Sequence, residues 1–176
     1  GGSEGGYGNT KKKAEIELLK IGHRTGMHIS IIRPSLVYGP NIKGNLKLML
    51  SGIESGWFPP MPEVNNRRSM VHVDDLVRAM LFISKSNKTK GEVYIVTDGE
   101  PYSSREIYNP MCTLTGRSIP KWSVPKILFT VISLGSQNYQ YKIRRLLGNE
   151  CYSSKKLEKI GFKAEKTLEN MYETSF

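Results

Sequence analysis

The stretch that indicates the fold class is KKKAEIELLKIGHRTGMHISII, residues 11–32. Its first half, Lys11 to Ile21, places apolar residues at the spacing of one helix face, and Gly22 and Gly26 stand near the predicted end of that helix. The second half, His28 to Ile32, is a short apolar run typical of a buried strand. A helix, a short turn and a buried strand in this order are typical of an α/β protein.

The rest of the chain continues this alternation. Asp74 is the expected N-cap of a helix at residues 76–84, and Ser103 or Ser104 with Glu106 is expected to open a helix that runs through Leu114. Prolines exclude regular structure from residues 57–62. The other predicted elements are strands at 68–73 and 93–96, helices at 46–53 and 124–134, a short helix between Ser154 and Gly161, and a last helix opening at Thr167.

Length and composition restrict the class of protein. With 176 residues, 38% of them hydrophobic, the chain is expected to form one compact domain or a domain with a small appendage. Its longest uncharged apolar run, residues 127–134, is far shorter than the roughly 20 residues of a membrane-spanning helix. The first six residues lack the features of a signal peptide, which predicts a reducing, cytoplasmic setting. Cys112 and Cys151 show no ligand or disulfide spacing, so we expect two buried thiols and no metal site.

The chain is strongly basic, with 26 Lys and Arg against 16 Asp and Glu. Clustered cations bind phosphate groups, so a nucleic-acid or membrane-surface module is one interpretation. The basic residues are densest at 11–13, 142–145 and 155–156, without the interleaved aromatics of a single-strand-binding surface. A small phosphorylated ligand uses the same charges, and we expect no nucleic-acid partner.

Tyr7 and Lys11 are four residues apart, so in a helix they share one face. A tyrosine is a poor base at neutral pH, but a nearby ammonium group favours the phenolate. Such a pair can move a proton to or from a sugar hydroxyl. Taken alone, this spacing also fits an ordinary pair of surface residues.

Three ordered motifs resemble those of the extended short-chain dehydrogenase/reductase family, the NAD-dependent sugar-nucleotide epimerases and dehydratases. Residues 7–15, YGNTKKKAE, resemble the YGx(S/T)KxxAE signature. Residues 33–40, RPSLVYGP, resemble RPxNVYGP, and residues 68–76, RSMVHVDDL, resemble R(D/S)xVHVxDL. Residues 154–162 resemble the closing SKxxxxLG(W/F) segment of the family.

The resemblance implies a role for several residues. Tyr7 and Lys11 would be catalytic and, with Pro34, would contact NAD. Arg68 falls on the position that binds the diphosphate of a nucleotide-diphosphate sugar, a task suited to a guanidinium. Further substrate contacts implied by the resemblance are Asn45, Leu46, Phe58, and Arg144 or Arg145. His72 and Asp75 are expected to be structural. Leu36 replaces an Asn that contacts the sugar region, and a leucine cannot donate that hydrogen bond.

The resemblance also implies a domain organisation. Residues 7–100 would form the C-terminal part of a Rossmann-like parallel sheet, with substrate-binding segments interleaved, and residues 101–176 a small α/β substrate-binding lobe. Residues 1–6 look like a linker or disordered start. The glycine-rich strand–turn–helix that binds the NAD pyrophosphate is expected upstream, in an N-terminal half that is not among these residues.

The expected function is that of a fragment of an NAD-dependent sugar-nucleotide epimerase, acting on a hexose by transient oxidation at C4 and inactive alone. The alternatives are a 4,6-dehydratase or reductase of the same family, and a non-catalytic sugar-nucleotide-binding module. The residues do not distinguish NAD from NADP. A homodimer that pairs through the Tyr7 helix is implied by the resemblance.

Overall fold

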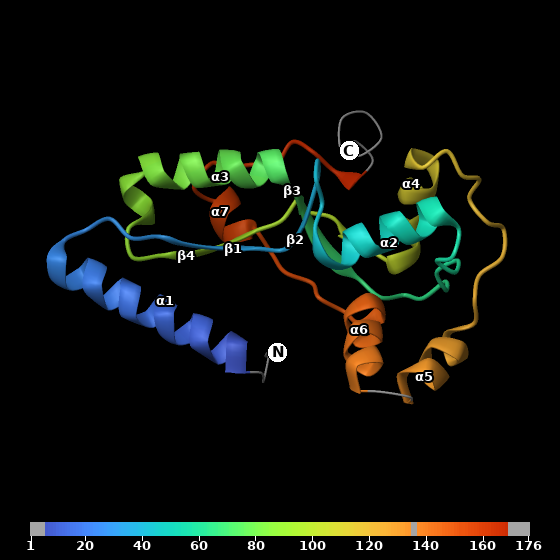
Figure 1. Ribbon diagram of the computed structural model, residues 1–176. Helices are drawn as coiled ribbons and strands as arrows, with labels where there is room; N and C mark the ends of the chain where they lie inside the picture. The colour runs from blue at the N-terminus through green and yellow to red at the C-terminus, as the bar shows by residue number, and fades with distance from the viewer. Residues whose placement is uncertain (1–5, 135–136, 169–176) are drawn as a thin grey trace.

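The computed structural model describes residues 6–134 and 137–168, without the side chains of residues 6, 7, 132–134, 138, 139 and 142. The elements alternate along the chain (Figure 1). The helices are α1 (Gly6–Thr25), α2 (Gly44–Ser55), α3 (Val73–Lys85), α4 (Ser104–Leu114), α5 (Lys126–Leu134), α6 (Gln137–Leu147) and α7 (Lys155–Glu158), with the 3-10 turn η1 (Asn87–Thr89). The strands are β1 (Ile31–Pro34), β2 (Leu36–Tyr38), β3 (Arg68–His72), β4 (Val93–Val96) and β5 (Pro101–Tyr102).

The strands form two small sheets. β1 pairs in parallel with β4, and β2 pairs in parallel with β3, which also pairs antiparallel with β5. Helices α1 and α3 lie on opposite sides of the β1–β4 pair, while α2, α4, α5 and α6 gather around the other end of the molecule (Figure 1). Because parallel strands need crossover connections, the intervening helices cover the sheet faces.

Two apolar clusters correspond to these two ends. The larger cluster joins β2, α2 and α4 through buried residues such as Tyr38, Met49 and Met111. The smaller cluster joins β3, β4, α3 and α7 through residues such as Val96 and Leu157. The chain therefore forms two packed regions that meet along β2 and β3.

Several predicted elements are confirmed. The strand at residues 93–96 and the strand from Arg68 agree with β4 and β3, and residues 46–53 fall within α2. Ser103 is the N-cap of α4, because its hydroxyl accepts a hydrogen bond from the Glu106 amide at 3.1 Å while the Glu106 carboxylate accepts one from the Ser103 amide at 2.6 Å. Beyond Leu168, the helix predicted to open at Thr167 lies outside the described residues.

The predicted start of α3 is wrong. The helix begins at Val73, directly after β3, and its N-cap is His72 rather than Asp74. The Nδ1 atom of His72 accepts the Asp74 amide hydrogen bond at 3.2 Å, so the imidazole performs the capping. The Asp74 carboxylate instead pairs with Lys166 at 2.5 Å.

The predicted strand at residues 28–32 is displaced. The strand β1 covers Ile31–Pro34, because its parallel pairing aligns Ile31 with Val93 and Pro34 with Val96. The residues before it are held by side chains, with the Ser30 hydroxyl donating to the Thr89 carbonyl at 2.6 Å. Tertiary pairing therefore moved the strand toward its carboxyl end, so that it shares only Ile31 and Ile32 with the predicted run.

The prediction of two buried thiols holds for Cys112 and is wrong for Cys151, which is exposed. Cys112 lies on the buried face of α4, whereas Cys151 lies in the segment between α6 and α7, with its thiol directed to the Arg67 carbonyl at 3.3 Å. Within the described part of the chain, no helix is both long enough and apolar enough to cross a lipid bilayer.

Candidate functional site

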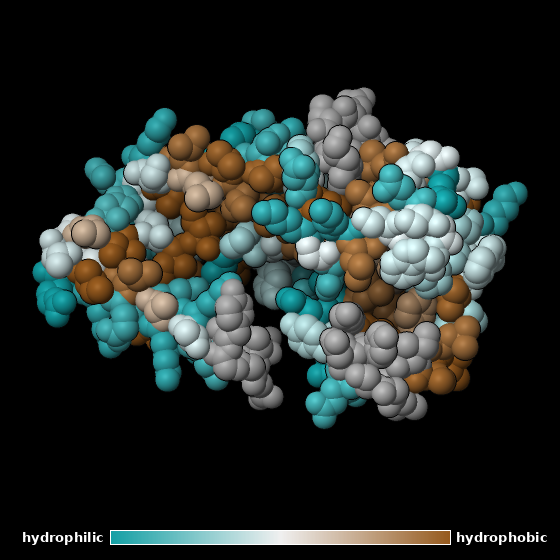
Figure 2. Space-filling model, viewed as in Figure 1, coloured by the Kyte–Doolittle hydropathy of each residue, from teal (hydrophilic) through white to brown (hydrophobic). Residues whose placement is uncertain are grey.

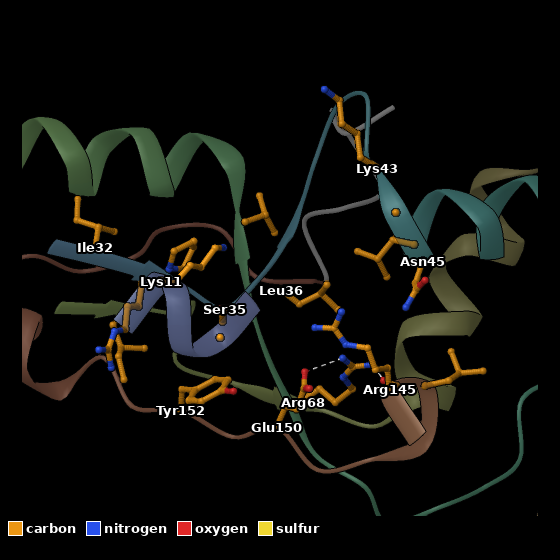
Figure 3. A pocket seen from close by; sticks show the side chains of 18 of the residues that line it. Lys11, Ile32, Ser35, Leu36, Lys43, Asn45, Arg68, Arg145, Glu150 and Tyr152 are labelled. Carbon is orange, nitrogen blue, oxygen red and sulfur yellow. Dashed lines mark hydrogen bonds and ion pairs between the residues drawn. The ribbon is translucent and has the colours of Figure 1, made fainter. Parts of the chain in front are cut away.

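A cleft of about 1230 Å³ lies between the two packed regions. Figure 2 shows the surface hollowed between the part that carries α1 and the part that carries α5 and α6. Its walls come from α1, from the β1–β2 connection, from the start of α2, from β3 and α4, and from residues at the end of α6 and just after it. Residues far apart in sequence therefore meet in one cavity (Figure 3).

One wall carries the predicted catalytic helix. Tyr7 lies in the first turn of α1 and Lys11 one turn later, and Lys11 lines the cleft. The i, i+4 spacing places both residues on the same face of the helix. The side chain of Tyr7 lies outside the described residues, so its predicted role stays a prediction. Helix α1 is tied to β1 by Glu15 and Arg33, whose Nε atom donates to both carboxylate oxygens at 3.1 Å.

The carboxyl end of β1 forms the floor of the cleft. Pro34, Ser35 and Leu36 all line it, and the Ser35 amide donates to the Val96 carbonyl at 3.0 Å, which fixes this end beside β4. In open α/β sheets, ligands bind outside the carboxyl ends of the strands. The position of the cleft therefore agrees with that of a ligand site in such folds.

The opposite wall carries Arg68, the first residue of β3. Its side chain is buried, one Nη atom donates to Glu150 at 2.9 Å, and the other donates to the Arg145 carbonyl. The Nε atom has no hydrogen-bond partner among the described residues. A parallel bridge between Arg68 and Glu150 aligns the two backbones. The guanidinium is thus held rigidly at the cleft wall (Figure 3).

The two candidate arginines of α6 differ in position. Arg145 lines the cleft, and its guanidinium lies 5.5 Å from the centre of the Tyr141 ring. Arg144 is not among the lining residues. The structure therefore brings Arg145, and not Arg144, to the wall that contains Arg68.

The other predicted substrate contacts also divide into residues that line the cleft and a residue that does not. Asn45 and Leu46 line the cleft at the start of α2, although Leu46 also belongs to the large apolar cluster. Phe58 is not among the lining residues and stacks against Tyr108 with 6.3 Å between the ring centres. Phe58 therefore contributes to packing in this structure.

The cleft is electropositive. Among the described residues, its lining contains six cationic side chains and two carboxylates: Lys11, Lys12, Arg33, Lys43, Arg68 and Arg145 against Glu15 and Glu150. The hydrogen bond from Arg33 holds the pKa of Glu15 below its ordinary value, so this carboxylate stays ionised and paired. An excess of fixed positive charge in a concave site favours an anionic ligand.

His72 and Asp75 are structural, as predicted. Burial lowers the pKa of His72, which favours the neutral ring that caps α3. Asp75 is almost fully buried, and its carboxylate accepts hydrogen bonds from the Glu165 and Lys166 amides at 3.0 and 2.8 Å. These contacts attach the last described segment to α3, and neither residue lines the cleft.

Sequence reasoning missed Glu150 and Tyr152, which line the cleft beside Arg68. No motif marks them, because they meet β3 only through contacts across about 80 residues of sequence, such as the 2.9 Å bond from the Tyr152 amide to the Ser69 hydroxyl. Lys43 was also missed, although it directly precedes the Gly44 start of α2.

Comparisons with known proteins identify a family and relatives of this chain. The model of the NAD dependent epimerase/dehydratase family matches residues 2–97. A UDP-glucose 4-epimerase of Vibrio cholerae is 29% identical over 123 residues, which cover 69% of this chain and 37% of that protein.

Solved structures show the same fold. A UDP-glucose 4-epimerase of Thermotoga maritima, with UDP-glucose, superposes with a TM-score of 0.71 at 19% identity, over 96% of this chain and 51% of that one. A dTDP-glucose 4,6-dehydratase of Bacillus anthracis, in complex with NAD, superposes with a TM-score of 0.70 at 18% identity, over 98% of this chain and 51% of that one. The chain thus spans about half the length of these structures and little more than a third of the Vibrio relative.

The predicted α/β class and Rossmann-like parallel sheet are thereby confirmed. The motifs at residues 7–15 and 33–40 and the segment 68–76 all fall within the matched range, and each supplies a residue to the cleft. The chain belongs to the NAD-dependent epimerase/dehydratase family.

Proposed function

We propose that this chain supplies the catalytic helix and the diphosphate-binding wall of an NAD-dependent sugar-nucleotide epimerase that acts at C4 of a hexose. The observation that carries the proposal is the meeting of Lys11 with Arg68 and Arg145 in a single cleft. One wall thus offers the helix of a proton-transfer pair, and the other offers guanidinium groups for a diphosphate.

The diphosphate end rests on Arg68 and Arg145. A guanidinium is permanently charged and donates in a fork that matches phosphate oxygens. The bonds of Arg68 to Glu150 and to the Arg145 carbonyl fix its orientation, which reduces the entropy lost when an anion binds. Glu150 accepts a hydrogen bond from one Nη atom of this guanidinium, so a bound diphosphate approaches from the cleft side or displaces that carboxylate.

The chemical end rests on Tyr7 and Lys11. The phenolate of Tyr7 accepts the proton of the C4 hydroxyl during oxidation, and the phenol that results returns this proton during reduction. Lys11, one turn along the helix, favours the phenolate and holds ribose hydroxyls through its ammonium group. The pair works as a proton-transfer unit only if α1 stays seated on β1, which the contact between Glu15 and Arg33 favours.

The residues present fit the nicotinamide-ribose half of NAD. Lys11 provides an ammonium donor for ribose hydroxyls, and Pro34 provides a rigid apolar surface at the carboxyl end of β1, in the same cleft. The bound cofactor supplies hydride acceptance and return at the sugar carbon. Leu36 adds an apolar surface here, so the sugar hydroxyls must find their hydrogen-bond partners elsewhere in the cleft.

The binding of UDP and UDP-glucose to the purified chain tests the diphosphate wall. Arg145→Gln is expected to weaken calorimetric affinity about tenfold to hundredfold, because a charge-assisted hydrogen bond is lost. Arg144→Gln is the matched control, with the same chemical change one residue outside the cleft lining, and should leave affinity within about twofold. Equal effects of the two substitutions would refute the assignment of this wall.

The change Tyr7→Phe separates an enzyme from a non-catalytic binding module. Measured in the intact enzyme with NAD and a UDP-hexose, it should abolish most turnover while leaving UDP affinity unchanged. A variant that retains full turnover contradicts the catalytic role. For the 176 residues alone we expect no turnover, since they contain no glycine-rich strand–turn–helix to cradle the NAD pyrophosphate, and micromolar NAD affinity by calorimetry would oppose this expectation.

A further inference from the structure

The charge of the chain is distributed unevenly. Between Glu106 and Glu150 the sequence contains no Asp or Glu and six basic residues, which are Arg117, Lys121, Lys126, Lys142, Arg144 and Arg145. Among those of the six whose side chains the structure describes, Arg145 alone lines the cleft. The region of α5 and α6 is therefore positively charged beyond what the proposed substrate site uses.

The same region exposes large apolar side chains. Trp122 is 63% exposed and Ile127 is 70% exposed, and we define the α5 patch as Ile119, Trp122, Ile127, Leu128 and Val131, all of them exposed. Helix α5 buries Phe129 in the large apolar cluster, while Ile127, Leu128 and Val131 on the same helix are exposed. Figure 2 shows hydrophobic side chains at the lower right edge, where Figure 1 places α5.

Two other groups of exposed apolar residues lie near acidic groups. Ile16 and Leu18 of α1 alternate with Glu15 and Glu17. Val77, Met80 and Leu81 of α3 are near the N-terminal Asp74 of that helix, and Arg78 between them is paired with Asp75 and Glu165. The α5 patch differs because its neighbours in sequence are exclusively basic or uncharged.

We propose that the α5 patch docks onto the surface of an anionic lipid bilayer. An exposed tryptophan and aliphatic side chains flanked by Lys121 and Lys126 have the composition of an interfacial segment, in which apolar groups enter the headgroup boundary and cations face anionic lipids. The apolar run of residues 127–134 is too short to span a bilayer, so the contact is peripheral.

The docking of the α5 patch onto a bilayer does not depend on the proposed epimerase activity. The position of the patch relative to the cleft nevertheless connects the two. Helix α5 packs against α6, and α6 carries Arg145 to the cleft wall. A bilayer bound at α5 would therefore lie close to the cleft and at the end of the molecule opposite α3 (Figure 1). Failure of vesicle binding would leave the UDP-binding prediction untouched.

Co-sedimentation with vesicles tests the proposal, using phosphatidylcholine vesicles with and without 30% phosphatidylserine. We expect binding to the anionic vesicles only, weakened more than tenfold by the double change Ile127→Ser and Val131→Ser. Lys121→Gln with Lys126→Gln should weaken binding by about tenfold at low salt. The chain has two tryptophans, so the variant Trp57→Phe retains Trp122 alone. The fluorescence emission of Trp122 in this variant should shift to the blue on vesicle binding.

The matched control is the double change Val77→Ser and Met80→Ser, which removes exposed apolar surface from α3 and should leave vesicle binding unchanged. Circular dichroism checks that every variant is folded. Absence of binding to anionic vesicles overturns the proposal, as does equal loss in the α3 control. The proposal is also overturned if the α5 double change abolishes self-association in analytical ultracentrifugation without affecting vesicle binding. A further contrary result would be that single-stranded DNA, as a polyanion, binds equally well to the α5 variant and to the unchanged chain while neither protein binds vesicles.

Discussion

The two walls of the cleft differ in how they are held. On the wall formed by α1, Ile16 and Leu18 are 44% and 48% exposed, and the tie to the sheet includes the ion pair of Glu15 and Arg33. On the wall formed by β3, α2 and α4, Met70 and Met111 are completely buried. Buried apolar contacts raise the free energy of local opening, so the second wall is the more firmly fixed.

The difference has a functional meaning for the proposed enzyme. The wall that would bind the diphosphate is positioned by a packed core, whereas the helix that would carry the proton-transfer pair is positioned by few contacts from the described residues. Changes that loosen α1 are therefore expected to leave diphosphate binding intact and to reduce turnover. The following predictions test this contrast.

The largest effect is expected in the packed wall. Met111→Ala should lower the free energy of unfolding by about 3 kcal/mol, because it leaves a cavity in the larger cluster. Leu18→Ala on α1 should change it by less than about 0.5 kcal/mol, since that side chain is half exposed. Urea denaturation measures both values. Comparable losses in the two variants would remove the contrast between the walls.

A buried carboxylate adds a pH dependence to the packed region. Burial raises the pKa of Asp98 from 3.8 to about 6. The folded chain therefore binds this proton more tightly than the unfolded chain, and the contribution of Asp98 to stability falls as pH rises from about 4 to about 6. As pH rises through this interval, the free energy of unfolding of Asp98→Asn should thus increase relative to that of the unchanged chain, by at most about 3 kcal/mol.

Urea denaturation at pH 4.5 and pH 7 measures this change. The variant also loses one of two acceptor contacts, to the Tyr102 hydroxyl at 3.0 Å or the Glu100 amide at 3.1 Å, but that loss is similar at both pH values. Titration of His72 cancels because it occurs in both proteins. A difference between the two proteins that is independent of pH would show that Asp98 titrates normally.

The capping box of α4 should have an intermediate effect. Ser103→Ala removes the hydroxyl that accepts the Glu106 amide hydrogen bond, and the expected loss is about 1 kcal/mol. Ser103→Asp is the matched change that restores an acceptor and should recover most of the loss. Thermal unfolding followed by circular dichroism measures both. No recovery with aspartate would mean that the hydroxyl acts through packing.

The smallest global effect is expected at the tie between α1 and β1. Glu15→Gln should lower overall stability by only about 0.5 kcal/mol, because Arg33 is half exposed and solvent screens the pair. Locally, amide hydrogen exchange in α1 should accelerate several-fold while exchange in α4 stays the same. Since Arg33 lowers the pKa of Glu15, the contribution of this pair is present above the ordinary carboxylate pKa and is lost as pH falls through the lowered value. Unchanged exchange in α1 would show that other contacts hold the helix.

The predictions from sequence succeeded where local chemistry decides. The run at residues 93–96 became β4, and Ser103 with Glu106 formed the predicted capping box. They failed where a neighbour far along the chain decides. The ring of His72 displaced Asp74 as the cap of α3, and pairing with β4 shifted β1 toward Pro34. Residues such as Glu150 had no local signal at all.

The sequence by itself determined the family, the charge and the order of the elements, because motifs, composition and periodicity are properties of neighbouring residues. Only the tertiary structure decided that Arg145 rather than Arg144 reaches the cleft, that Phe58 packs against the larger apolar cluster, and that Glu150 orients Arg68. Those outcomes depend on which side of a helix faces a cavity and on which distant strands pair, and both follow from the packing of the whole chain.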